Sequence, residues 1–89
     1  MEVFEKKLTP SERRRHWIRV PAASLDCFPP GNESFYVGIG SERVKVKIDS
    51  KNRLLGLGLT YFRKLHLEAQ GASVVVEKLS PEGYVIRKK

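Results

Sequence analysis

Short segments of alternating polar and apolar residues dominate this sequence, and they restrict the folds that are open to it. The clearest segment is Arg43–Asp49, in which valine and isoleucine take every second position and cations take most of the others. A period of two is that of a β-strand with one buried face. The segment Phe35–Ile39 has the same pattern, and Gly40 and Ser41 between the two predict a tight turn. The pair therefore predicts a hairpin that covers a core with one face and exposes three cations, Arg43, Lys45 and Lys47, on the other.

The rest of the chain carries further segments with strand or helix character. Strands are expected at Trp17–Val20, Leu54–Leu59, Ser73–Lys78 and Tyr84–Arg87, with a short edge strand at Val3–Leu8. Gly56 and Gly58 predict a bend or bulge within the second of these. Short helices are expected at Ala22–Phe28 and Tyr61–Leu67, the latter with Thr60 as its N-cap. Turns are expected at Thr9–Glu12, Pro29–Asn32 and Ser80–Gly83.

These elements occur twice in the same order. Each of the units Ile18–Ile48 and Leu54–Ile86 holds an apolar strand, a brief helix and a hairpin, so the chain has the form of a pseudo-repeat. Two units that close on each other would form a small open β-barrel and hide most strand edges. The 89 residues suffice for one core. We therefore expect a mainly β fold with two short helices, as a single pseudobarrel domain over residues 12–89 after an N-terminal extension or edge strand over residues 1–11.

The chain is strongly basic. Its 17 lysines and arginines outnumber its 10 acidic residues, which gives a net charge of +7. Such an excess attracts polyanions such as DNA, RNA or anionic lipid. No run approaches the ~18 apolar residues of a membrane span, and the first residues lack the apolar core of a signal peptide. With Cys27 as the only cysteine, no disulfide can form within the chain. We expect a cytoplasmic protein without membrane contact.

Residues suited to catalysis or metal binding are scarce. His16 and His66 are the only histidines and Cys27 is the only thiol, which leaves a Cys/His zinc site without enough ligands. The carboxylates are scattered, mostly beside cations, and do not suggest an acid–base pair. Two Gly-x-Gly triplets, at 38–40 and 56–58, lack the third glycine of a dinucleotide site. We expect no enzyme, no metal and no cofactor.

Basic residues concentrate at the start of the first well-marked strand. Arg13, Arg14 and Arg15 stand in a row and are followed by His16 and by the single tryptophan, Trp17. A guanidinium can donate two hydrogen bonds to guanine O6 and N7, and any cation can bind a phosphate. His16 is either a phosphate ligand or a plain surface residue. Trp17 either belongs to the core or stacks on a base or sugar.

A second basic segment, Asp49–Arg53, follows the strand with the outward lysines. Its Asn52 could bind adenine N6 and N7 through its amide, and the lysines of the strand suit phosphates. All of these cations could equally form the solvated surface of a basic protein. The candidate nucleic-acid-binding residues are Arg13, Arg14, Arg15, His16, Trp17, Arg19, Lys45, Lys47, Lys51, Asn52 and Arg53.

Several of these runs resemble a known family. The run Arg15–Pro21, followed by Leu25 and by Phe28 and Pro29, is similar to the opening of the DNA-binding pseudobarrel domains. That family includes the plant B-three transcription-factor domains and the DNA-recognition domains of certain bacterial restriction enzymes. The segments Val44–Ile48, Leu59–Lys64 and Ser73–Val76 resemble its second half, so that the resemblance covers residues 13–89. A half-unit also resembles the AbrB-type swapped-hairpin regulators.

The resemblance implies a wrench-like grip on the major groove by two loops, which correspond here to Ser11–Trp17 and Ser50–Arg53. Both are basic in this chain, so we expect sequence-specific binding of double-stranded DNA, as a small regulator or as a recognition module. Two alternatives stay open, an RNA-binding barrel and an antitoxin or assembly module that binds an acidic protein. A closed pseudo-repeat predicts a monomer and an AbrB-like assembly predicts a dimer; we expect the monomer.

Overall fold

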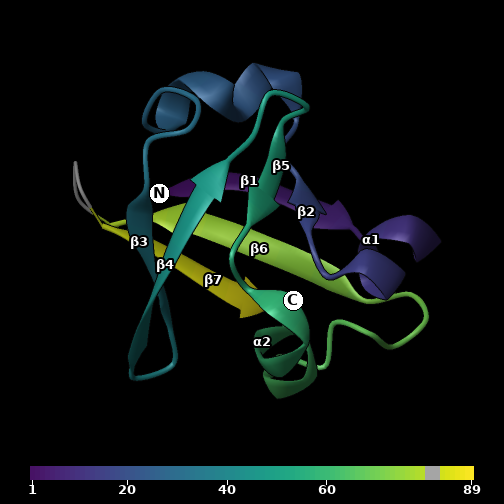
Figure 1. The fold of residues 1–89 in the computed structure, drawn as a ribbon. Helices are drawn as coiled ribbons and strands as arrows, with labels where there is room; N and C mark the ends of the chain where they lie inside the picture. Colours follow the sequence, from purple (N-terminus) through teal and green to yellow (C-terminus); the bar gives the residue numbers. More distant parts are fainter. Residues whose placement is uncertain (80–82) are drawn as a thin grey trace.

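The computed structural model describes residues 1–79 and 83–89, and Figure 1 shows a mainly β fold. The strands are β1 (Glu2–Lys7), β2 (Ile18–Arg19), β3 (Phe35–Ile39), β4 (Glu42–Ile48), β5 (Arg53–Leu55), β6 (Ser73–Lys78) and β7 (Tyr84–Lys88). The helices are α1 (Pro10–Arg15), the 3-10 helix η1 (Ala22–Cys27) and α2 (Gly58–Lys64). The predicted fold class is confirmed, with three short helices in place of the two expected.

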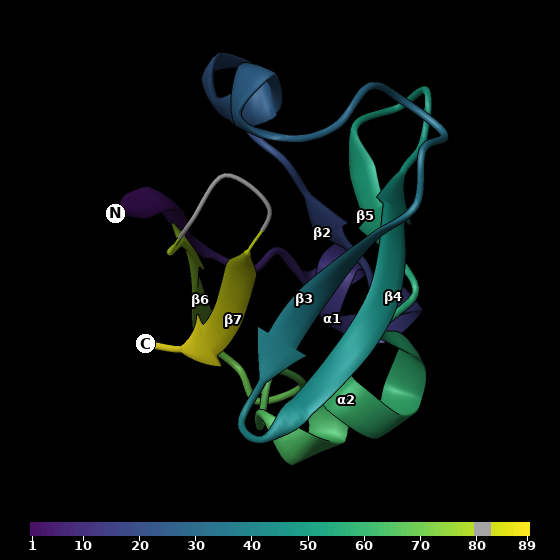
Figure 2. The same cartoon turned by 90° about the vertical axis from the view of Figure 1, so that its left-hand side faces the viewer.

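The strands form one curled sheet in the order β1-β6-β7-β3-β4-β5-β2. Neighbouring strands are antiparallel except β3 and β7, which run parallel. Figure 2 shows β6 and β7 on one side of the resulting half-barrel and β4, β5 and β2 on the other. The end strands β1 and β2 are not paired with each other among the described residues, so the barrel is open, as the sequence predicts.

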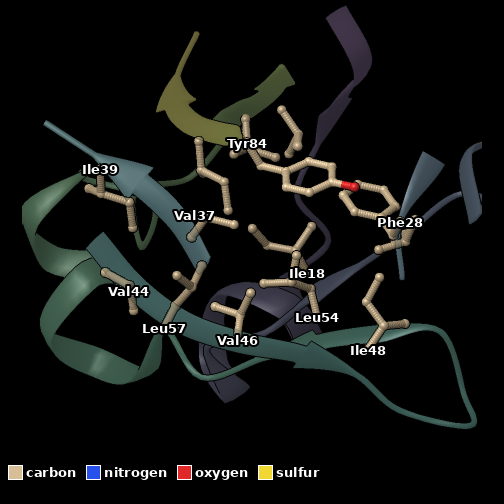
Figure 3. Packing of buried hydrophobic residues seen from close by; sticks show 14 of the residues in the cluster. Ile18, Phe28, Val37, Ile39, Val44, Val46, Ile48, Leu54, Leu57 and Tyr84 are labelled. Carbon is tan, nitrogen blue, oxygen red and sulfur yellow. The ribbon is translucent and has the colours of Figure 1, made fainter. Parts of the chain in front are cut away.

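Alternating side chains fill the inside of the half-barrel. Val44, Val46 and Ile48 of β4 are buried, whereas Lys45 and Lys47 between them are exposed. The hairpin predicted from this alternation is therefore confirmed, with β3 as its second strand. Figure 3 shows the inward residues of β4 packed against those of β2, β3 and β5.

An aromatic group ties η1 to the sheet. Phe28, directly after η1, stacks on Tyr84 of β7 with ring centroids 5.1 Å apart, and Phe35 of β3 lies 5.2 Å from the same ring. The Tyr84 hydroxyl donates a 2.6 Å hydrogen bond to the carbonyl oxygen of Cys27. The helical segment predicted at 22–28 is confirmed in position, and its function in the fold is to deliver Phe28 to the core.

Helix α1 is the main departure from the sequence prediction. The segment was expected to be a turn followed by a basic loop, but Pro10–Arg15 is helical. Thr9 and Glu12 form a capping box, because the Thr9 hydroxyl accepts the Glu12 N–H at 3.2 Å and the Glu12 carboxylate accepts the Thr9 N–H at 2.8 Å. Proline at the first position suits a helix start. The predicted turn was thus the first turn of a helix.

The segment between β5 and α2 also differs from the prediction. Strand β5 ends at Leu55, because the chain turns away at Gly56, where φ is 120°. A Cβ atom on Gly56 would lie 2.6 Å from the carbonyl oxygen of Lys45, so only glycine fits this close approach. Helix α2 then begins at Gly58, so Thr60 lies inside the helix and is not its N-cap, which is Leu57. The predicted bend is confirmed, and the predicted helix start is three residues late.

The predicted pseudo-repeat holds for the order of elements but not for their pairing. Strand, helix and hairpin follow one another twice, as β2-η1-β3-β4 and β5-α2-β6-β7. As far as the structure describes the chain, the sheet contains a β3–β7 pair but no corresponding β6–β4 pair. The N-terminal segment also joins the sheet as β1, at its edge beside β6, with Phe4 and Leu8 buried. The turn predicted at Ser80–Gly83 falls largely outside the described residues.

Candidate nucleic-acid interface

Trp17 and two arginines form a compact group on the outward side of β2 and β5. The register sets Arg19 directly opposite Arg53, and both guanidinium carbons lie 5.4 Å from the centre of the Trp17 ring. Trp17 is half-buried and lies outside the buried cluster of the described residues. Like charges opposite each other repel, and an aromatic ring close to both cations offsets part of this repulsion. We call these three residues the Trp17 cluster.

Asp49 fixes the loop that carries Arg53. One carboxylate oxygen accepts the main-chain N–H groups of Lys51 and Arg53, each at 2.9 Å. The other accepts Nε and Nη2 of the Arg53 guanidinium, each at 2.7 Å. Partial burial raises the pKa of Asp49, but the hydrogen bonds from Arg53 and Lys51 outweigh it, so the pKa lies below its ordinary value of 3.8. The loop is therefore organised by Asp49, which the sequence analysis did not single out.

Asn52 connects this loop to the residues that follow β2. Its backbone is left-handed, with φ at 62°, a conformation that asparagine tolerates better than most residues. Its carbonyl oxygen accepts the N–H of Val20 at 2.7 Å, which joins the loop to the chain that follows β2. Asn52 thus has a structural role in linking the two basic segments, whereas Lys51 beside it is exposed.

Glu12 holds α1 and both end strands together on the open side of the half-barrel. It is only 1% exposed, and one carboxylate oxygen accepts the Arg19 N–H at 2.7 Å and Lys6 Nζ at 2.8 Å. Lys6 belongs to β1 and Arg19 to β2, so the carboxylate bridges the unpaired ends of the sheet. Burial raises the pKa of Glu12, but the hydrogen bonds from Lys6, Thr9 and Arg19 outweigh it, and the pKa lies below its ordinary value of 4.5.

The three consecutive arginines lie on α1 and point to different surroundings. Arg14 and Arg15 are exposed. Arg15 lines an open pocket of about 440 Å³ together with Trp17 and Arg19, which places it beside the Trp17 cluster. Arg13 is half-buried, and its Nε is enclosed without a hydrogen-bond partner among the described residues.

His16 lies between the two helices. It ends α1 in a left-handed conformation with φ at 63°, its ring meets Phe62 of α2 edge-on at 5.5 Å, and its Nε2 lies 3.1 Å from Glu68 Oε2. The hydrogen bond from His16, together with Arg63, lowers the pKa of Glu68 below its ordinary value. The structure therefore gives His16 a role in packing, and a nucleic-acid contact by His16 stays an untested prediction.

The candidate cations of β4 lie further along the same outward side of the sheet. Lys47 is opposite Leu55 of β5, and Lys45 is opposite Tyr36 of β3. Both lysines line a shallow hollow of about 290 Å³ that also includes Gly56. The predicted residues thus lie on α1, on the paired strands β2 and β5, and on β4. Helix α1 adjoins the β2–β5 pair.

Charge is distributed unevenly over the described residues. On the outward side of β1, β6 and β7, Arg87 pairs with Glu77 at 2.8 Å and Lys89 pairs with Glu5 at 2.5 Å. The candidate cations, by contrast, are mostly without a carboxylate partner in the described part of the chain: Arg13, Arg14, Arg15, Arg19, Lys45, Lys47 and Lys51. Cations without a carboxylate partner among the described residues are therefore most numerous on α1, β2, β5 and β4, and such a cluster attracts polyanions.

Residues 1–79 and 83–89 contain no group of three histidine, cysteine or carboxylate side chains placed to hold a metal ion. Among the same residues, no helix has the length and apolar character needed to cross a membrane.

Comparisons with known proteins bear on the fold. No protein-family model and no curated protein matches this sequence. The structure is similar to that of the N-terminal domain of Helicobacter pylori LlaJI.R1, with a TM-score of 0.74 and 14% sequence identity. The similarity extends over 99% of this chain and 80% of that chain. At this level of identity the two proteins share a fold, and that fold takes in the complete set of strands and helices described above.

Proposed function

We propose that this chain is a binding domain, not an enzyme, and that it recognises double-stranded DNA through α1, the Trp17 cluster and the Asp49–Arg53 loop. The observation that carries the proposal is the Trp17 cluster, in which the guanidiniums of Arg19 and Arg53 both lie 5.4 Å from the centre of the half-buried Trp17 ring. The open half-barrel and the resemblance of the sequence to DNA-binding pseudobarrels both support it.

Arg53 is the residue best placed to read a base. Asp49 binds its Nε and one N–H of Nη2, which leaves the end of the guanidinium free to donate from both Nη atoms. End-on donation from two N–H groups matches the O6 and N7 acceptors of guanine in the major groove. Because Asp49 and Trp17 already orient the group, little side-chain entropy is lost on binding.

The remaining cations supply affinity. Arg14 and Arg15 on α1 and Lys51 in the loop are exposed and unpaired among the described residues, as suits contacts to phosphate oxygens. Such contacts release counterions and are insensitive to sequence. About six of them would cost on the order of 10³-fold in affinity between 50 and 200 mM salt.

The proposal is tested by selecting bound duplexes from a random pool and measuring their affinity by fluorescence anisotropy at several salt concentrations. We expect an enriched guanine-containing sequence and a steep salt dependence. Arg53→Ala and Arg53→Lys should both lose discrimination by about 1–3 kcal/mol at one guanine, since lysine keeps the charge but not the paired donors.

Arg87→Ala is the matched control, because Arg87 also pairs with one carboxylate but lies on the opposite side. It should leave selected and random duplexes bound as before. An affinity that does not change with salt, or equal losses from Arg53→Ala and Arg87→Ala, would contradict the proposal.

A further inference from the structure

A second surface that combines an aromatic ring with cations lies on the outward side of the β3–β4 hairpin. Tyr36 is 46% exposed, which is unusual for a large aromatic side chain in this structure. The guanidinium carbon of Arg43 lies 4.8 Å from the centre of its ring. Lys45 is directly opposite Tyr36 in the register. We call Tyr36, Arg43 and Lys45 the Tyr36 face.

The hairpin register explains why these side chains meet. Arg43 is opposite Gly38, and a glycine there leaves no side chain between Arg43 and Tyr36, which is two residues earlier on the same side of β3. Arg43 can therefore lean across the strand onto the ring. Alternate residues of a strand are about 6.8 Å apart, so Arg43 and Lys45 present two charges at regular steps along β4.

No carboxylate of the described residues compensates these charges. Within residues 1–79 and 83–89, neither Arg43 nor Lys45 is in an ion pair, and the nearest acidic residue in sequence, Glu42, is bound by Tyr61 and Lys64 of α2 instead. The charge of the Tyr36 face is therefore available to an anion from outside.

The geometry points to the Tyr36 face as a binding site for single-stranded nucleic acid, separate from the duplex-binding surface proposed above. The two cations suit the phosphodiester backbone, and the exposed ring suits an unpaired base, because any base can stack on an aromatic side chain. A duplex keeps its bases stacked within the helix and could use the cations but not the ring. The carboxylates of an acidic peptide would pair with the cations but gain nothing from the ring, so the ring favours a ligand with unpaired bases.

The test is the affinity of the full chain for a labelled oligothymidylate of about ten nucleotides, which is within the range of single-strand site sizes. Comparing this affinity with that for an oligouridylate of the same length shows whether the site prefers single-stranded DNA or RNA. Tyr36→Ala should weaken binding by roughly 5- to 150-fold, and Tyr36→Phe should stay within about 2-fold of the parent because the ring is kept. Lys45→Ala should weaken binding and reduce the salt slope by about 0.7.

Lys88→Ala is the matched control, because Lys88 is an exposed lysine on β7 that is in no ion pair among the described residues. It should have no effect. Arg53→Ala separates the two sites, since it should reduce duplex binding and leave the oligothymidylate bound. The inference is overturned if neither oligonucleotide binds, if Tyr36→Ala binds as well as the parent, or if Arg53→Ala abolishes both activities. The inference is also overturned if Lys45→Ala weakens the binding of a duplex or of an acidic peptide but leaves the binding of the oligothymidylate unchanged.

Discussion

Replacing Glu12 by alanine should cost this domain a large part of its stability. The carboxylate is almost completely buried and accepts hydrogen bonds from the main-chain N–H groups of Thr9 and Arg19 and from Lys6 Nζ. Each buried N–H left without an acceptor costs about 1–3 kcal/mol. The Lys6 ammonium is 22% exposed and regains water, so it adds less.

The sum of these losses is about 3–5 kcal/mol, the range found when one partner of a buried ion pair is removed. A domain of this size has a free energy of unfolding of about 5–10 kcal/mol, so Glu12→Ala should remove roughly half of it. At about 4–8 °C per kcal/mol, the melting temperature should fall by about 15 °C or more. Urea unfolding measures the free energy and a thermal scan measures the melting temperature, both followed by circular dichroism.

Glu12→Gln and Glu77→Ala serve as comparisons. The amide of glutamine keeps the shape but offers one acceptor group where two are needed, so it should give a smaller loss than alanine. Glu77 is a surface carboxylate in an exposed pair with Arg87, and its removal should leave the unfolding midpoint unchanged. If Glu12→Ala costs less than about 1 kcal/mol, as for a surface pair, the carboxylate does not join the two ends of the sheet.

The same carboxylate gives a pH dependence with a defined sign. The pKa of Glu12 in the folded protein lies below its ordinary value of 4.5, so the unfolded chain takes up a proton first as the pH falls. The stability contributed by ionised Glu12 is therefore fully present above the ordinary pKa of 4.5 and is lost as the pH drops through the lower pKa of the folded protein. The difference in unfolding free energy between the parent and Glu12→Gln should shrink between about pH 7 and pH 3. A difference that is constant over this range would contradict the assignment.

Three further changes test separate parts of the structure. His16→Asn keeps a residue that accepts the left-handed backbone but removes the ring that meets Phe62, so it should cost about 1 kcal/mol in urea unfolding; a loss of duplex affinity as well would show that His16 also contacts nucleic acid. Gly56→Ala would bring a methyl group to 2.6 Å from the Lys45 carbonyl oxygen, and the loss should be about 2 kcal/mol or more; a neutral result would mean that β4 and the bend are further apart. Tyr84→Phe removes one hydrogen bond to the main chain at the end of η1 and should lower stability by about 1 kcal/mol, and no change would show the hydroxyl to be hydrated instead.

The strands that sequence predicts best are those whose pattern is set by one buried face. In β3 and β4 the alternation is unbroken, so the side that faces the core and even the hairpin partner follow from local sequence. In α1 no apolar period marks the helix, and its arginines suggested an exposed loop. That helix depends on a capping box and on Glu12, whose partners Lys6 and Arg19 lie on different strands and cannot be paired by local rules.

The sequence predicts the two basic segments of the candidate site but not how their side chains are arranged in space. The Trp17 cluster depends on the pairing of β2 with β5, a long-range contact that places Arg19 opposite Arg53. The role of Asp49 was hidden because a single acid in a basic loop looks like a neutralising residue. Tyr36 and Arg43 were missed as a pair, because they lie on different strands and meet only through the pairing of β3 with β4.

The single tryptophan offers the most direct measurement of the central proposal. Trp17 gives one indole N–H resonance and all of the tryptophan fluorescence of the chain, and it lies at the centre of the proposed duplex-binding surface. Titration with the selected duplex should shift that resonance and change the fluorescence, with the same dissociation constant as anisotropy reports. A duplex that binds tightly by anisotropy while the Trp17 indole signal stays unchanged would place the binding surface elsewhere on the molecule.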